Sequence, residues 1–339
     1  MELREIGEFG LIAEIAGDLG DKDGELVVGI GDDAAVIKSR PDLYTVVSSD
    51  AFVEDVHFRL EYFSFFDLGW RLAAANLSDI SAMGGRPKHL LVNLALPRGT
   101  TVEQVKELYR GLRAIAEKFA VTVVGGDTVS SPGKLFLSAT VLGEVAPNDL
   151  KLRSGAKPEE GIFITGFPGL AQVGLSVLTK SAPRRSFYVQ SVARHLRPVP
   201  RVSEVRHLLK KFTTVGAMID ISDGLASELH HFCRQSGVGA LIDENGIPLH
   251  PELTAASAEF GGSALQFALT GGEDFEILFT AAPGDKLAMQ TSLQESFGLP
   301  LSQIGITTNQ PGEIHIRNNQ GDLVVLPNTG FDHFADPND

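Results

Sequence analysis

The sequence of 339 residues has a single cysteine, Cys233, so the chain cannot form an internal disulfide. It also lacks any stretch that approaches the roughly 20 consecutive apolar residues of a membrane-spanning helix. The first residues, Met1 to Ile6, do not place a basic region before an apolar one, so we expect no signal peptide. Together these absences favour a cytoplasmic location.

Positive charge is scarce. Lysine and arginine together number 29 against 43 aspartate and glutamate residues, and the formal net charge is −14. This excess of negative charge argues against nucleic acid and against anionic membranes as partners. If the ligand is a polyphosphate, bound cations or local basic side chains have to offset the repulsion.

Several motifs of common enzyme classes are missing or incomplete. Gly133-Lys134-Leu135 is not a Walker A phosphate loop, and no Gly-x-Ser-x-Gly motif is present. Residues 29–34 fit the Gly-x-Gly-x-x-Ala dinucleotide fingerprint, but Pro41 and the short spacing leave little room for the helix that this fingerprint requires. His230-His231 has no second ligand pair, so we favour packing over zinc binding.

Apolar strands alternate with amphipathic helices, which predicts a two-domain α/β (α+β) fold. The clearest helix spans 102–119, with Thr100 and Glu103 as a capping box. A polar stretch at 146–161 separates an N-terminal domain at 1–148 from a C-terminal domain at 149–339. We predict further helices at 2–17, 68–83, 170–180, 202–211, 224–236 and 285–296, and strands at 26–30, 43–47, 90–96, 121–124, 135–141, 162–165, 217–219 and near 240.

Aspartates recur in one kind of position. Small residues and aspartate repeatedly follow an apolar strand, and Asp79 lies late in a predicted helix. Any one of these acids is explained more simply as a turn residue, but strand ends are where α/β proteins collect ligands. A carboxylate set without matching His or Cys suits Mg²⁺. The acids that follow strands are Asp32, Asp33, Asp50, Asp127, Asp220 and Asp223.

Short motifs follow one another in a specific order along nearly the whole chain: Gly29–Val36, Ser49-Asp50, His57-Phe58, Leu77–Gly84, Gly125–Thr128, Arg153–Ala156, Asp220–Leu225, Gly271–Glu276 and Gly330–Phe334. In this order they resemble the thiamine-monophosphate kinase family, which is related to aminoimidazole ribonucleotide synthetase and selenophosphate synthetase. His57-Phe58 and the last two motifs favour the thiamine branch. The selenophosphate branch usually has a reactive Cys near its N-terminus, and the first 30 residues here contain none.

The resemblance implies a homodimer in which the N-terminal mixed sheets, with their helices, form a dimeric β-barrel. It implies a C-terminal α/β domain that completes the active site, and catalytic roles for Asp50, Asp127 and Asp223. The implied metal ligands are Asp33, Ser48, Ser49, Asp50, Asp79, Asp127, Asp220 and Asp223. The implied nucleotide contacts are Tyr109, Gly126, Asp127, Arg153 and Ser222, and the implied acceptor contacts are His57, Glu273 and Phe331.

The implied activity is transfer of the γ-phosphoryl group of ATP to thiamine monophosphate. The acceptor oxygen is ionised near neutral pH, so no strong general base is needed. Several Mg²⁺ ions held by the aspartates would neutralise and align the two anions, and a K⁺ requirement stays open. Two alternatives also remain: an ATP-using relative with a different small acceptor, and a non-catalytic protein that binds Mg²⁺ and nucleotide.

Overall fold

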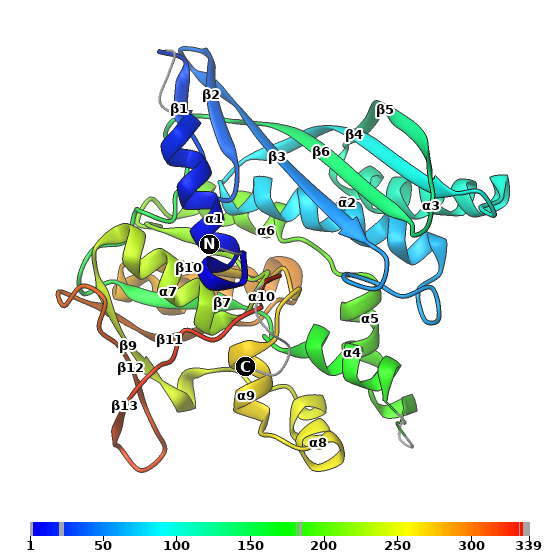
Figure 1. Ribbon diagram of the computed structural model, residues 1–339. Coiled ribbons are helices and arrows are strands. Elements are labelled where there is room, and N and C mark those ends of the chain that lie inside the picture. Colours follow the sequence, from blue (N-terminus) through cyan, green and yellow to red (C-terminus); the bar gives the residue numbers. More distant parts are fainter. Residues whose placement is uncertain (1–2, 20–23, 181, 183–184, 332, 335–339) are drawn as a thin grey trace.

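The computed structural model describes residues 3–19, 24–180, 182, 185–331 and 333–334. Its strands form two mixed sheets, one of six strands and one of seven, with helices packed on them (Figure 1). The predicted α/β (α+β) class is therefore confirmed. Within these residues no helix is both long and apolar enough to cross a membrane.

The six-stranded sheet is built from the first half of the chain. Only β4 and β5 run parallel, and the other neighbouring strands are antiparallel. In the single chain this sheet is open, with β1 and β5 at its edges. Its order is β1 (Leu26–Val28), β2 (Ala35–Arg40), β3 (Leu43–Val53), β6 (Phe136–Val145), β4 (Arg86–Pro97) and β5 (Thr122–Ser131).

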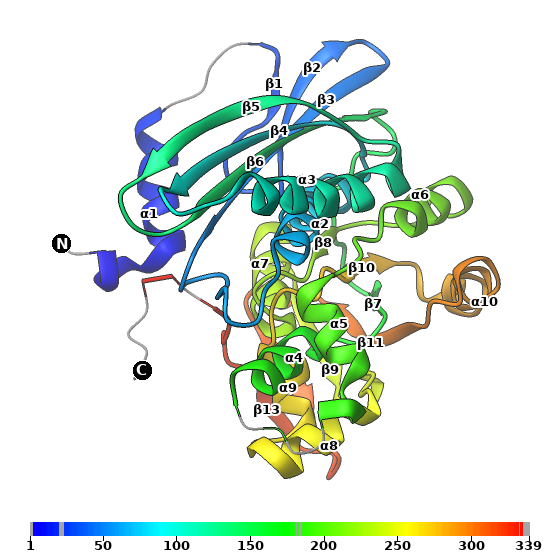
Figure 2. The same ribbon diagram turned by 90° about the vertical axis from the view of Figure 1, so that its right-hand side faces the viewer.

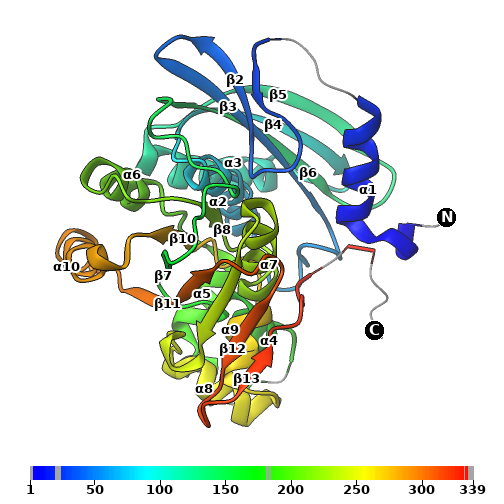
Figure 3. The ribbon, with the colours of Figure 1, turned by 90° about the vertical axis from the view of Figure 1, so that its left-hand side faces the viewer.

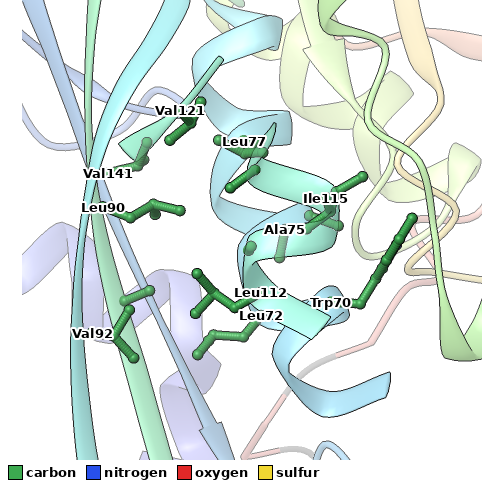
Figure 4. Close-up of a cluster of buried hydrophobic side chains, with 14 of the residues drawn as sticks. Trp70, Leu72, Ala75, Leu77, Leu90, Val92, Leu112, Ile115, Val121 and Val141 are labelled. Carbon is green, nitrogen blue, oxygen red and sulfur yellow. The ribbon is translucent and has the colours of Figure 1, made fainter. Parts of the chain in front are cut away.

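Helices α2 (Phe65–Ala82) and α3 (Val102–Ala116) lie on the same side of this sheet (Figure 2). Apolar side chains of both helices, such as Leu72 and Leu112, face those of the sheet in one buried cluster (Figure 4). The helices cross in close contact, because a Cβ at Gly69 would lie 1.9 Å from the Leu108 carbonyl oxygen. Because both helices lie on one side, the opposite face of the sheet is not covered by α2 or α3 (Figure 2).

The seven-stranded sheet lies between two groups of helices (Figure 3). One apolar cluster joins it to α4 (Leu170–Thr179), α7 (Leu225–Ser236), α8 (Pro251–Phe260) and α9 (Ala264–Thr270), and a second joins it to α6 (Val202–Lys211) and α10 (Lys286–Phe297). Helix α5 (Val189–Leu196) packs on α4, and α1 (Leu3–Leu19) reaches α7 through the rings of Phe9 and His231. The strand order is β13 (Leu323–Val325), β12 (Ile314–Arg317), β9 (Gly239–Asp243), β11 (Leu301–Thr308), β7 (Gly161–Thr165), β10 (Ile277–Ala281) and β8 (Met218–Asp220).

Two strands differ from the prediction in a way that matters for the site. Strands predicted to stop at 47 and at 124 continue through the following Ser, Gly and Asp residues to Val53 and Ser131. Small and acidic residues have low β-propensity, but continuous pairing with β6 and β4 keeps these segments extended. Asp50 and Asp127 therefore lie within strands and not after them.

The other differences are local. The capping box of α3 is made by Thr101 and Gln104, one residue later than predicted. Strand β2 and helix α5, together with α8, α9 and β10 to β13, were not predicted. The predicted domain boundary at 148/149 falls between β6 and β7 in the chain and stays a prediction.

Candidate functional site

Strand β3 and helix α2 bring together acids that are distant in sequence. Alternate residues of a strand point to the same face, so Ser48 and Asp50 share the α2 side with the buried Val46 and Phe52. The Ser48 hydroxyl donates a hydrogen bond of 2.6 Å to Oδ2 of Asp79 on α2. The resulting serine–carboxylate contact fixes the strand against the helix at the site.

The next residue of α2 connects this point to the seven-stranded sheet. The Ser78 hydroxyl donates to Oδ2 of Asp220, at the end of β8. Because Ser78 and Asp79 are adjacent on α2, their two bonds hold carboxylates from both halves of the chain at one place. Sequence analysis did not single out Ser78.

Arg153 is the basic side chain at this site. Its Nε donates to Oδ1 of Asp33 at 3.1 Å, its Nη2 contacts the same oxygen, and its backbone N–H donates to Asp32 at 3.2 Å. Asp33 is nearly inaccessible, and its Oδ2 has no hydrogen-bond partner among the described residues. We call Asp33, Asp50, Asp79 and Asp220 the acidic cluster.

Burial and mutual repulsion make the acidic cluster costly to ionise. Burial raises the pKa of Asp50 to about 6, and burial followed by the charge of Asp33 raises that of Asp220 to about 8. Burial, then Asp50 and Asp220, holds the pKa of Asp79 well above its usual value. One guanidinium among four carboxylates leaves a deficit of positive charge, which bound cations would fill.

The donor atoms fit Mg²⁺ in chemistry, since they are carboxylate and hydroxyl oxygens. Within the described ranges, no group of three His, Cys, Asp or Glu side chains is arranged to hold a metal ion by itself. Mg²⁺ commonly binds one or two carboxylates and completes its shell with water and substrate phosphates. The acidic cluster accordingly fits ions that a nucleotide would help to hold.

Ser49 and Asp127 do not join the acidic cluster. The Ser49 hydroxyl points to the outer face of the sheet, away from α2, and donates to the carbonyl of Ala139 at 3.0 Å. Asp127 is exposed on the edge strand β5, where its N–H donates to Oδ1 of Asn93. Register places Gly126 three strands from Asp50, a separation of roughly 14 Å.

Two predicted nucleotide contacts share this distant edge. A Cβ at Gly126 would lie 1.8 Å from the carbonyl oxygen of Val92, so only glycine fits there. Tyr109, on α3, is partly buried against the N-terminal core, and burial raises its pKa. Within the described part of the chain, neither forms a hydrogen bond or ion pair with Arg153 or with Ser222.

The loop after β8 carries Ser222 and Asp223. Oε1 of Glu228 accepts from the Asp223 N–H at 3.0 Å and from the Ser222 hydroxyl at 3.4 Å. Glu228 is fully buried, and burial followed by the charge of Asp223 raises its pKa well above the usual value. Sequence analysis missed Glu228, although its place in the first turn of α7 is typical of a carboxylate that holds the preceding loop.

The predicted acceptor contacts meet on the other side of this loop. The backbone N–H of Glu273 donates to the carbonyl of Ser222 at 2.7 Å, and that of Phe331 donates to the carbonyl of Asp223 at 3.2 Å. His57 stacks on Phe52 with ring centroids 5.5 Å apart, and His333 lies 4.8 Å from both His57 and Phe331. We call Phe52, His57, Phe331 and His333 the aromatic cluster. Asp332 lies outside the described residues.

Arg71, which sequence analysis did not consider, lies beside the aromatic cluster. It is 0% exposed on α2 and forms an ion pair with Glu273. Its guanidinium carbon lies 5.8 Å from the ring centroid of Phe52 and 5.2 Å from that of Phe63. The run of Leu and Ala residues that follows Arg71 predicts a helix with a wide buried face, and this was the signal in the sequence that could have identified Arg71 as a buried cation.

Comparison with known proteins gives the chain its family. The N-terminal domain of AIR synthase related proteins matches residues 31–145, and the C-terminal domain matches residues 158–318. The hydrogenase maturation protein HypE in complex with ATP, 19% identical with a TM-score of 0.68, covers 92% of this chain and 88% of its own and shows the shared fold.

Other relatives are more similar. Thiamine-monophosphate kinase of Bacillus subtilis (strain 168) is 37% identical over 310 residues, which cover 91% of this chain and 93% of that protein. The solved structure described as AaThiL complexed with AMPPCP and TMP is 31% identical, has a TM-score of 0.82, and covers 98% of this chain and 99% of its own. The chain therefore belongs to the thiamine-monophosphate kinase family.

Proposed function

We propose that this protein phosphorylates thiamine monophosphate with ATP to give thiamine diphosphate and ADP. The observation that carries the proposal is the acidic cluster, which joins both halves of the chain and has an excess of buried negative charge. Relatives that carry the name of this activity, and a neighbour solved with AMPPCP and TMP, support the choice of nucleotide and acceptor.

The acidic cluster and Arg153 have different roles in the reaction. An oxygen of the acceptor phosphate forms a bond to the γ-phosphorus while the bond to the β,γ-bridging oxygen breaks, and ADP leaves. Asp33, Asp50, Asp79 and Asp220 would hold Mg²⁺, which supplies charge neutralisation for the two anions when bound. Arg153 binds nucleotide phosphate as a fixed cation.

The loop at Ser222 and Asp223 places the two substrates next to each other. Ser222 and Asp223 bind the nucleotide and its metal on one side, and their carbonyls hold the backbones of Glu273 and Phe331 on the other. Phe331, with 53% of its surface exposed, is free to stack on the thiamine rings. His57 packs at the same place, and Glu273 holds a cationic or amino group of the rings.

The remaining predicted residues act from a second copy of the chain. Asp127 and Gly126 lie too far from Asp50 within one chain to share its ions, and Ser49 faces the outer side of the sheet. That face also exposes apolar side chains, including Leu91, and such a surface is typical of an interface. We therefore propose a cytoplasmic homodimer joined through the outer sheet faces as a β-barrel, with residues 149–339 completing each site.

The activity is tested by incubating the protein with Mg²⁺, ATP and thiamine monophosphate and following thiamine diphosphate by chromatography. We expect stoichiometric formation of thiamine diphosphate and ADP. Tight binding of Mg-ATP without turnover would instead favour a non-catalytic nucleotide-binding protein. ADP release with another small acceptor only would favour a different branch of the superfamily.

The shared site is tested by mixing two inactive variants, Asp50→Asn and Asp127→Asn, after partial denaturation and refolding. If Asp127 acts in the partner's site, a mixed dimer contains one site with neither substitution and regains part of the wild-type turnover. Mixtures that stay as inactive as each variant alone would place both residues in the same site or remove Asp127 from catalysis.

A further inference from the structure

We infer that Arg71 binds the phosphate group of the acceptor directly and makes the site select a phosphorylated acceptor. This inference rests on the proposed function and adds a residue to it. Arg71 is a fully buried cation that has one acidic partner among the described residues, Glu273, whose side chain is 35% exposed. A buried charge with incomplete compensation is costly, so it is expected either to bind a ligand or to hold the fold together.

Among the described residues, Nε of Arg71 has no hydrogen-bond partner. Nη2 lies against the Glu273 carboxylate as an ion pair, so a phosphate that takes both nitrogens has to displace that carboxylate from Nη2. Nη1 faces Nε2 of His195 at 3.5 Å on the other edge. Nε and Nη2 form the side of arginine that binds phosphate through two parallel hydrogen bonds.

The surroundings of Arg71 hold this edge in place. The rings of Phe52 and Phe63 pack against the guanidinium, which limits its rotation. Glu273 has a left-handed backbone (φ 65°), uncommon for a residue with a side chain, and its N–H is tied to Ser222. Such strain persists where the surrounding structure requires it, and here it accompanies the contact between the carboxylate and Arg71.

Position along α2 places Arg71 next to the reacting groups. Ser48 meets Asp79 and Phe52 meets Arg71, so strand and helix run alongside each other with Asp50 between these contacts. Arg71 and Asp79 are eight residues apart, about 12 Å along the helix axis. An acceptor phosphate between them would contact the Arg71 side chain on one side and the metal ions of Asp50 on the other.

The test compares thiamine monophosphate with thiamine, which lacks the phosphate. Dissociation constants of both are measured with Mg²⁺ and AMPPCP present for wild type, Arg71→Met and Arg71→Lys. We expect Arg71→Met to weaken thiamine monophosphate about 10- to 100-fold and to leave thiamine nearly unchanged. Arg71→Lys keeps the charge but loses the two-pronged edge, so an intermediate loss is expected.

Arg197→Met is the matched control. Arg197 also pairs with a carboxylate of α2, Asp67, and lies over the ring of Phe66 at 4.9 Å, but it has no contact with Glu273. Its removal should leave the ratio of the two dissociation constants at the wild-type value. Thermal unfolding of each variant checks the fold, and Arg71→Lys serves if Arg71→Met does not fold.

Equal weakening of both ligands in Arg71→Met would overturn the inference, because Arg71 would then act only by orienting Glu273. An unchanged ratio, or a wild type that binds both ligands equally, would overturn it as well. Failure of the proposed function is a separate result, since it would show as a wild type that makes no thiamine diphosphate.

Discussion

The acidic cluster and the region around Arg71 lie on the same pair of elements, β3 and α2, but compensate buried charge in different ways. In the acidic cluster, several carboxylates crowd around Arg153, and burial raises their pKa values. Eight residues away on α2, Arg71 packs against aromatic rings and, in the described ranges, meets one carboxylate. The first arrangement needs added cations and the second can accept an anion, so the two regions suit the two halves of a phosphoryl transfer.

The largest effect is expected from removing a charge in the acidic cluster. Asp50→Asn should lower turnover on the order of 100- to 1,000-fold, because an amide is a much weaker ligand for Mg²⁺. The fold should persist, since the neutral amide is easier to bury. Steady-state kinetics at saturating Mg²⁺, with circular dichroism for the fold, checks this.

Asp55→Asn is the control for this change. Asp55 lies just after the same strand, is exposed and pairs with Lys134. Its positive φ of 71° suits asparagine, so turnover should stay close to wild type. A fully active Asp50→Asn variant would show that the acidic cluster does not hold the catalytic ions.

Metal removal tests whether nucleotide binding at the acidic cluster depends on cations. If cations must join the acidic cluster to the nucleotide, AMPPCP should raise the melting temperature by several degrees with Mg²⁺ present and hardly at all in EDTA. Saturation at 100 times the dissociation constant corresponds to about 2.7 kcal/mol of stabilisation. Differential scanning fluorimetry measures both shifts. An equal shift in EDTA would mean that Arg153 suffices for binding the nucleotide.

The smallest effect concerns the helix behind the acidic cluster. His231 on α7 is buried, and burial followed by the charge of Arg153 lowers its pKa to about 4. The unfolded chain takes up this proton near pH 6.5, so unfolding becomes easier as the pH falls from about 6.5 to 4. In His231→Gln, the decrease in unfolding free energy over this pH range should be smaller than in wild type by about 2 kcal/mol or less.

The measurement for His231 is urea unfolding at several pH values between 4 and 7. The quantity compared is the difference in unfolding free energy between variant and wild type, because other groups titrate in the same range. A difference for His231→Gln that does not change with pH would contradict the neutral state of His231 in the fold.

Sequence patterns predicted much of the scaffold. The helices at α2, α3, α6 and α7 were placed within a few residues, because their periodic apolar residues are a local signal. The chemical type of the site was likewise visible as a set of aspartates in a chain with few cations. Local propensity failed where Asp50 and Asp127 continue a strand, since pairing with neighbouring strands decided the backbone there.

The sequence set which side chains are available: acids for cations, and one arginine within a helix rich in Ala and Leu. Which of these side chains meet depends on the fold. Strand alternation turns Ser48 and Asp50 toward Asp79 and turns Ser49 away, and strand order places Asp127 at the far edge. Burial of α2 on all sides gave Arg71 its partners, because contacts between distant segments set the local dielectric and charge that no pattern of neighbours contains.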